Sequence, residues 1–189
     1  MPKKRNENKK MCLYLDTCIL RNAFSKRNKD DILLLEYVRK NKLTCVTSIY
    51  TLLELYEISK DRKFLMNLVV DGWAEVNTYL RNRSKKDLNI DELLNISEQI
   101  NNLFRNYDFI EFRNIAGDND WNLLKEICEV SNLHLSDNIH LATAYINDCT
   151  HLITRDDFFI EEGNKILRQN DIPPEELKIC SPNEILKNS

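Results

Sequence analysis

The stretch MCLYLD, residues 11–16, is a run of five mainly apolar residues that ends in a carboxylate. Such short, continuously apolar runs are typical of strands buried on both faces of a sheet. Similar runs recur at LTCVTS (43–48), DFIEF (108–112), THLIT (150–154) and LKICS (177–181). Short buried strands that alternate with helices predict an α/β fold, with a five-stranded parallel sheet between two helical layers.

The segments between these runs carry helical signals. DILLLEYVRKNK (31–42) begins with acids and ends with bases, as the helix dipole favours. In IYTLLELYEIS (49–59) the apolar residues fall on one helical face. Ser136 is the expected N-cap of the helix that follows it. The later helices are expected at 121–130, 137–148 and 158–169, with a short one at the end.

One domain is expected, because 189 residues with 42% hydrophobic content suit a single core. We expect a basic flexible arm over residues 1–10, a single domain over 11–189, and a helical excursion within it at about 61–108. The pattern of this excursion predicts two helices with a break near RNRSKKD (81–87). Only 3 Gly and 4 Pro are present, which disfavours sandwiches, barrels and disordered linkers, since these need many turn residues.

The net charge of -3 conceals a gradient along the chain. Residues 1–42 carry 12 Lys/Arg against 5 Asp/Glu, whereas residues 111–189 carry 7 against 15. Because the N-terminal part is basic and the C-terminal part is acidic, the total charge does not exclude a nucleic-acid partner. Basic clusters at 3–10, 39–42, 60–63 and 81–86 are either solvated faces or tracks for phosphates.

The composition also favours a cytoplasmic protein without a membrane span. No apolar run approaches the roughly 18 residues of a transmembrane helix, and no signal peptide is evident. The six cysteines include no C-x-x-C pair, so reduced thiols are expected rather than a disulfide or zinc framework. His134 and His140 are six residues apart, a spacing that does not suit a helical zinc site. The string PKKR resembles a nuclear-import signal but is too short to decide the location.

Four acids stand near the carboxyl ends of the expected strands. Asp16 ends the first strand, and Glu54 lies in the helix after the second. Asp137 opens a helix, and Asp156 follows the fourth strand. Sites in open parallel sheets form at this edge, where the strand order reverses, so the four side chains are expected to converge. Clustered carboxylates need compensating cations, and hard oxygen ligands suit one or two Mg²⁺ or Mn²⁺ ions that activate a water.

Taken singly, each acid has an ordinary explanation. Asp16 could start a turn or cap a helix, and Asp137 could simply compensate the helix dipole. Glu54 could be a solvated helix residue, and Asp156 and Asp157 could be loop acids. The prediction of a metal site rests on the four acids taken together. No rival nucleophile motif is present, since G-x-S-x-G, Walker A and G-x-G-x-x-G are all absent from the sequence.

That joint pattern resembles the PIN-domain family. The resemblance rests on YLDTCIL (14–20), TSIYTLLELYEI (47–58), SDNIHLATAY (136–145) and HLITRDDFF (151–159), which occur in the family's order. The closing LKICSPNEIL (177–186) is similar to the family's final strand and tail. In these blocks an Asp followed by Thr ends the first strand, a Glu lies six residues after a Ser, and a T-x-D follows the fourth strand.

The resemblance implies a sheet in the order 3-2-1-4-5 and divalent-metal-dependent cleavage of RNA. It assigns metal-binding and catalytic roles to Asp16, Glu54, Asp137 and Asp156. Arg155, the base nearest to the proposed ions, is expected to contact a phosphate or to pair with a ligand carboxylate. Supporting or substrate-contacting roles are expected for Thr17, Ser48, Thr154, Arg155, Asp157 and His140.

The leading hypothesis is therefore an endoribonuclease that acts on single-stranded or looped RNA. One version of this hypothesis is a toxin of the VapC-like type. Its midsection helices would then bind an antitoxin protein or a second copy of the chain. Residues 61–108 are long for that type, which speaks against it. The alternatives are a non-catalytic adaptor that binds RNA or protein, and a Mg²⁺-dependent phosphatase. Against the phosphatase, Cys18 stands where aspartyl-phosphate enzymes commonly carry a second Asp.

Overall fold

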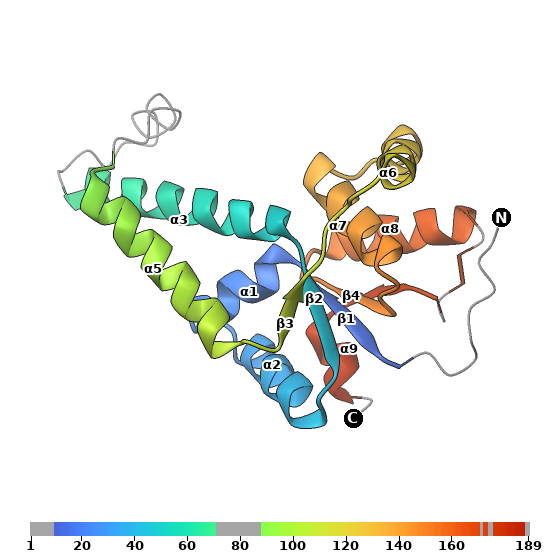
Figure 1. Cartoon of the computed structure of the whole chain (residues 1–189), viewed down its shortest axis with the longest axis horizontal. Coiled ribbons are helices and arrows are strands. Elements are labelled where there is room, and N and C mark those ends of the chain that lie inside the picture. Colours follow the sequence, from blue (N-terminus) through green and yellow to red (C-terminus); the bar gives the residue numbers. More distant parts are fainter. Residues whose placement is uncertain (1–9, 71–87, 171, 174–175, 188–189) are drawn as a thin grey trace. The chain divides into compact units, whose positions relative to one another are not determined.

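The computed structural model describes residues 10–70, 88–170, 172–173 and 176–187. Its strands form one parallel sheet in the order β3-β2-β1-β4-β5 (Figure 1). This is the α/β fold that the sequence predicts, with the strand order that the family resemblance implies. The strands are β1 (Cys12–Leu15), β2 (Thr44–Thr47), β3 (Ile110–Phe112), β4 (His151–Ile153) and β5 (Lys178–Cys180).

Contacts between residues divide the chain into two units. The first comprises Met1–Thr51 and Tyr107–Ser189 and contains the whole sheet, and the second comprises Leu52–Asn106. The helices of the first unit are α1 (Thr17–Phe24), α2 (Lys29–Asn41), α6 (Asp118–Val130), α7 (Leu135–Ile146), α8 (Asp157–Gln169) and α9 (Pro182–Lys187).

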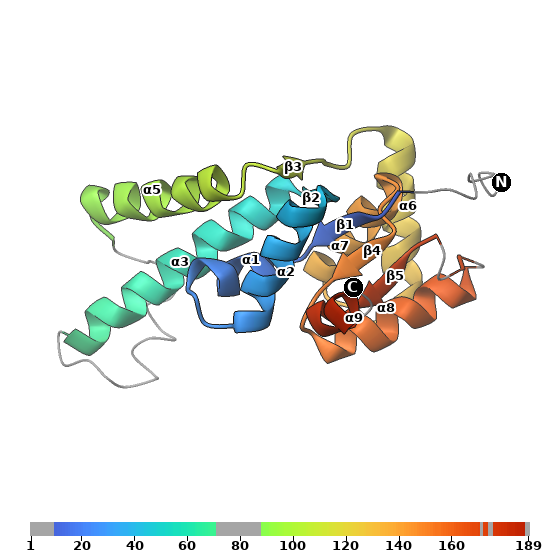
Figure 2. The same ribbon diagram turned by 90° about the horizontal axis from the view of Figure 1, so that it is seen from below.

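The sheet is the middle layer of three. Tyr14, Val46 and Leu152 point to one face, where they form a buried core with the apolar sides of α6, α7 and α8. The alternate strand residues, such as Leu13 and Ile153, are also fully buried and point to the other face. Helices α1, α2 and α9 lie on that side (Figures 1 and 2). Burial on both faces explains why the strands are continuously apolar rather than alternating.

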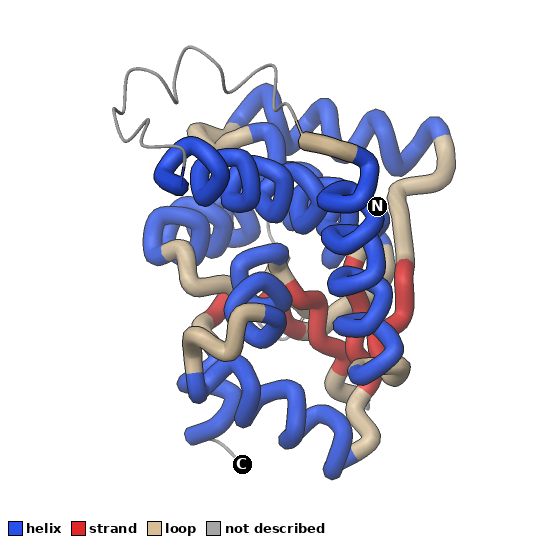
Figure 3. Tube along the Cα trace, turned by 90° about the vertical axis from the view of Figure 1, so that its left-hand side faces the viewer, coloured by secondary structure: helices blue, strands red, loops and turns tan. Residues whose placement is uncertain are grey.

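Strand β1 lies in the middle of the sheet and sets the position of the site. Leu13 pairs with Cys45 of β2 on one side and with His151 of β4 on the other. All strands run parallel, so their carboxyl ends lie at one edge of the sheet. Figure 3 shows the strands in red, grouped side by side. The chain leaves β1 toward β2 and later returns to β4, so the strand order reverses at β1. The edge just beyond Leu15 is therefore the place where such sheets bind ligands.

Several helices differ from the sequence expectations. Helix α1 was not expected, and α3 (Ile49–Val70) continues well past residue 59. Ser136 is not the N-cap of α7; that position belongs to His134, whose carbonyl oxygen accepts the first helical bond from the Asn138 amide at 3.0 Å. The helix therefore starts before the serine, which lies within its first turn.

The second unit contains most of α3 and the helix α5 (Ile90–Asn106). Asn89 and Glu92 form a reciprocal N-terminal cap on α5, with both side-chain-to-backbone bonds at 3.0 Å. Glu92 also accepts from the Asn67 amide of α3 at 2.9 Å. Within the midsection the described residues are helical over 61–70, as the end of α3, and over Ile90–Asn106, while the expected break near 81–87 lies outside the described residues. No described helix is both long enough and apolar enough to cross a membrane.

Candidate metal site

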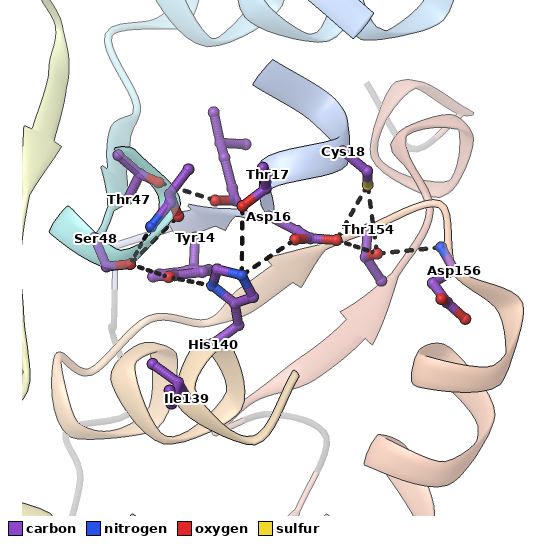
Figure 4. Close-up of polar contacts among 12 residues, drawn as sticks. Tyr14, Asp16, Thr17, Cys18, Thr47, Ser48, Ile139, His140, Thr154 and Asp156 are labelled. Carbon is purple, nitrogen blue, oxygen red and sulfur yellow. Dashed lines mark hydrogen bonds and ion pairs between the residues drawn. The ribbon is translucent and has the colours of Figure 1, made fainter. Parts of the chain in front are cut away.

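Asp16 lies at the carboxyl end of β1, where its backbone amide donates to the carbonyl of Ile153 at 3.1 Å and extends the pairing with β4. Its side chain is buried and held from several directions (Figure 4). The Oδ2 atom accepts the Thr154 hydroxyl at 2.6 Å and the Cys18 thiol at 3.1 Å. The Oδ1 atom lies 3.5 Å from Nε2 of His140. The carboxylate is therefore fixed in orientation before any ligand binds.

Asp137 is influenced by the charges of two other predicted site residues, Asp16 and Asp156. Its pKa is raised from 3.8 to about 6, chiefly because burial disfavours its charge. The negative charge of Asp16 raises the pKa further, as does that of Asp156, whereas His140 and His134 oppose the shift. The charges of Asp16 and Asp156 therefore both act on the Asp137 carboxyl and disfavour its ionised form.

Asp156 is joined to Asp16 through one hydroxyl. It is the N-cap of α8, where its Oδ1 atom accepts the Phe159 amide at 3.0 Å. Its own amide donates to the Thr154 hydroxyl oxygen at 3.1 Å, and that hydroxyl donates to Asp16. Thr154 therefore contacts the Asp16 carboxylate and the Asp156 backbone, and its supporting role at a metal site stays a prediction. Asp157 lies exposed in the first turn of α8, where the helix dipole explains an acid.

Glu54 lies in the second unit, on α3, one turn after Thr51. Its role as a ligand stays a prediction. Ser48, six residues earlier, is buried and accepts the Thr51 amide at 3.1 Å, so it caps the start of α3. Its hydroxyl oxygen also accepts from the phenol of Tyr14 at 3.0 Å. Ser48 therefore fixes the helix that carries Glu54.

His140 is a buried partner of Asp16, with only 1% of its surface exposed. Its Nδ1 atom lies 2.8 Å from the Tyr14 phenol oxygen, and its Nε2 atom lies 3.4 Å from the Thr17 hydroxyl. The Tyr50 ring packs against the imidazole edge to face, at 5.6 Å between centroids. Asp16 and His140 each offer a ligand atom, close enough together to hold a metal ion between them. The ring faces the carboxylate rather than solvent.

Tyr14→Phe is expected to lower the free energy of unfolding by about 1–3 kcal/mol, because it removes the hydroxyl that pairs with both Ser48 and His140. Urea denaturation at pH 7 measures the change. Tyr37→Phe, at a half-buried position on α2, is the matched control and should change stability by less than about 0.5 kcal/mol. Equal effects of the two substitutions would show that the buried network contributes nothing.

Arg155 pairs with a carboxylate that the sequence analysis did not select. Its Nε atom donates to both oxygens of Asp31 on α2, at 2.7 and 2.9 Å, and its Nη2 atom donates to Asn28 Oδ1 at 2.8 Å. Asp31 is fully buried, and Asn22 donates to it at 2.9 Å. Burial raises the pKa of Asp31, while the Asn22 amide and the Arg155 guanidinium oppose the rise. Of the two roles expected for Arg155, ion pairing is the one seen, but with Asp31 and not with a predicted ligand.

Cys18 is the second contact that sequence reasoning missed. Its sulfur donates to Asp16, lies 3.6 Å from the Thr154 hydroxyl, and accepts the Arg155 amide at 3.3 Å. Burial raises the pKa of the thiol, and the charge of Asp16 raises it further, so the group stays protonated at neutral pH. The thiol therefore serves as a hydrogen-bond donor that orients Asp16.

Asp137→Asn is expected to stabilise the metal-free protein by about 1–3 kcal/mol at pH 7. The folded chain binds the Asp137 proton more tightly than the unfolded chain does, so the stability of the wild type falls as pH rises from about 4 to about 6. The gain from Asn should accordingly shrink toward pH 4. Thermal unfolding with a chelator present measures it, and Asp118→Asn, at an exposed site on α6, is the control. No gain at pH 7 would contradict the clustering of charge at Asp137.

We compared the chain with models of known protein families and with curated protein sequences, and neither comparison found a match.

Proposed function

We propose that this chain is a divalent-metal-dependent endoribonuclease in which Asp16, Glu54, Asp137 and Asp156 bind one or two Mg²⁺ or Mn²⁺ ions. The observation that carries the proposal is the position of Asp16 at the edge where the strand order reverses, beside His140 and joined to the Asp156 backbone through the Thr154 hydroxyl. Acids whose pKa is raised by burial and by the charges of neighbouring acids, as that of Asp137 is, cluster at functional sites. The sequence resemblance to PIN domains supports the choice of RNA as substrate and of Glu54 as the fourth ligand.

The donor set fits a hard cation. Carboxylate oxygens suit Mg²⁺ and Mn²⁺, and the imidazole of His140 beside Asp16 would favour Mn²⁺ if it joined the site. When bound, such an ion supplies an activated water and neutralises charge on the phosphodiester. The surrounding residues of the chain orient the carboxylates. Thr154 and Cys18 fix Asp16, and the start of α8 fixes Asp156.

Four further expectations from the sequence remain predictions. They are the cleavage of single-stranded or looped RNA, a toxin role with an antitoxin partner, a homodimer, and a cytoplasmic location. The proposed metal site does not depend on any of them.

RNA cleavage under controlled metal supply tests the proposal. A labelled RNA that contains a hairpin and single-stranded arms is incubated with Mn²⁺, with Mg²⁺, or with EDTA. We expect internal cuts only when a divalent cation is present, with activity restored when Mn²⁺ is added in excess over EDTA. Cation-independent cleavage would contradict the metal mechanism. RNA binding without cleavage under any of these conditions would favour a non-catalytic adaptor.

A further inference from the structure

The connection between α1 and α2 is a basic loop that is not among the clusters selected from the sequence. From Thr17 to Lys29 the chain carries four bases and no acid. Three of these bases, Lys26, Arg27 and Lys29, lie exposed in or beside the loop over residues 25–28. We refer to Lys26, Arg27 and Lys29 as the basic triad.

The charges of the basic triad are available to a ligand. The acids that follow it, Asp30 and Asp31, both face Arg155, at 3.7 Å and 2.7 Å. Among the ion pairs found in the described part of the chain, none involves a member of the triad. Arg155 thus pairs with the neighbouring acids, and the positive charges of the basic triad face solvent.

The loop is held in a defined conformation. The Arg27 amide donates to the Asn22 carbonyl at 3.0 Å, and the Lys26 amide donates to the Ala23 carbonyl at 3.2 Å. Lys26 adopts a left-handed backbone conformation with φ of 50°, which reverses the chain after α1. Asn28 then caps α2 by accepting the Asp30 amide at 3.0 Å. The three cations are therefore displayed on a rigid turn.

The same loop is fastened to the carboxylate site through one residue. Arg155 donates to Asn28 with its guanidinium at 2.8 Å and to the sulfur of Cys18 with its backbone amide at 3.3 Å. Cys18 in turn donates to Asp16, and Asp156 follows Arg155 directly in the chain. The basic triad therefore borders the acids that would repel a polyanion, and it can offset that repulsion during approach.

We propose that the basic triad binds the phosphodiester backbone of a nucleic-acid strand and guides it to the carboxylate site. That the strand is RNA rests on the proposed function, whereas the binding of phosphates rests on the triad itself. Exposed Lys and Arg side chains bind phosphates without reading sequence, and each such contact adds to the salt dependence of binding.

The test measures binding rather than cleavage. The triple variant Lys26→Gln, Arg27→Gln and Lys29→Gln is compared with a control of equal net charge, Lys125→Gln, Lys165→Gln and Arg168→Gln, whose positions are exposed on α6 and α8. Fluorescence anisotropy follows a single-stranded RNA and a DNA of the same sequence, over a range of salt concentrations with EDTA present.

Each phosphate contact contributes about 0.7 to the slope of log K against log salt concentration. The triad variant should therefore lose about 2 from that slope and bind at least about tenfold more weakly at low salt, while the control keeps the wild-type slope. The effect should be the same for RNA and DNA, because phosphates are common to both. An unchanged slope, equal losses in both variants, or no binding by the wild type would overturn the inference.

The outcomes separate this inference from the proposed function. If the triad variant loses binding while the wild type cleaves no RNA, the phosphate-binding role stands and the nuclease proposal fails. If the wild type cleaves RNA while the triad variant keeps the full salt dependence, the nuclease proposal stands and the phosphate-binding role fails.

Discussion

Asp16→Asn is expected to reduce metal-dependent RNA cleavage by at least about 100-fold while leaving the fold intact. The carboxylate lies at the centre of the site, held by the Thr154 hydroxyl and the Cys18 thiol. An amide oxygen can still accept from these donors, so the local structure should persist. What is lost is the negative charge that a cation needs. The rate of cleavage at saturating Mn²⁺ measures the effect.

Two controls accompany this substitution. Asp118→Asn makes the same chemical change at an exposed position on α6 and should cleave at the wild-type rate. The pKa of Asp137 should also fall in Asp16→Asn, because the charge of Asp16 raises it. Cleavage within threefold of the wild type would show that Asp16 is not a ligand. Loss of cleavage together with loss of the folded state would shift the test to Asp156→Asn.

Arg155→Met is expected to lower the free energy of unfolding by about 3–5 kcal/mol. The substitution leaves Asp31 fully buried without its guanidinium partner, which normally makes two bonds to it at 2.7 and 2.9 Å. Removing one member of a buried pair is costly because the other charge stays desolvated. Urea denaturation at pH 7 measures the loss. Arg168→Met, at an exposed position on α8, should change stability by less than about 0.5 kcal/mol.

The double variant Arg155→Met and Asp31→Asn identifies the cause. If the unpaired charge is responsible, the double variant should be more stable than Arg155→Met alone, because it removes that charge. A double variant less stable than either single one would attribute the loss to packing. A loss below about 1 kcal/mol in Arg155→Met would contradict the assignment of a strong ion pair.

The sheet could be predicted from the sequence because four of its strands, β1, β2, β4 and β5, are largely buried on both faces, whereas β3 at one edge exposes Glu111 and Phe112. That burial demands short, continuously apolar runs such as CLYL in β1 and TCVT in β2, and those runs are visible without a structure. Helix α1 was not predicted for two reasons. Its sequence TCILRNAF includes β-branched residues, which do not favour a helix, and eight residues are too few to show a helical periodicity. The start of α7 was misplaced because a serine is a good N-cap by type, whereas the backbone hydrogen bonds select His134.

The carboxylates of the site could be predicted because each follows a strand or opens a helix. The charges of Asp16 and Asp156 do act on Asp137, as expected of residues at the carboxyl edge of a parallel sheet, whereas their roles as ligands stay predictions. Their supporting contacts were harder to foresee. Asp31 and Arg155 are 124 residues apart, and the helix dipole already explains an acid in the first turn of α2. Only the folded backbone brings the pair together, and Cys18 likewise gains its role from its neighbours.

Direct binding of Mn²⁺ is the measurement that tests the central claim, since it needs neither the right RNA nor catalysis. Calorimetric titration of the full chain at pH 7 should show one or two Mn²⁺ ions per chain. Binding should be lost or weakened at least about tenfold in Asp16→Asn and in Asp156→Asn, and kept in Asp118→Asn. Lowering the pH below about 6 should weaken binding by the wild type, because Asp137 then takes up a proton. No binding by the wild type, or equal binding by all the variants, would contradict a metal site formed by these carboxylates.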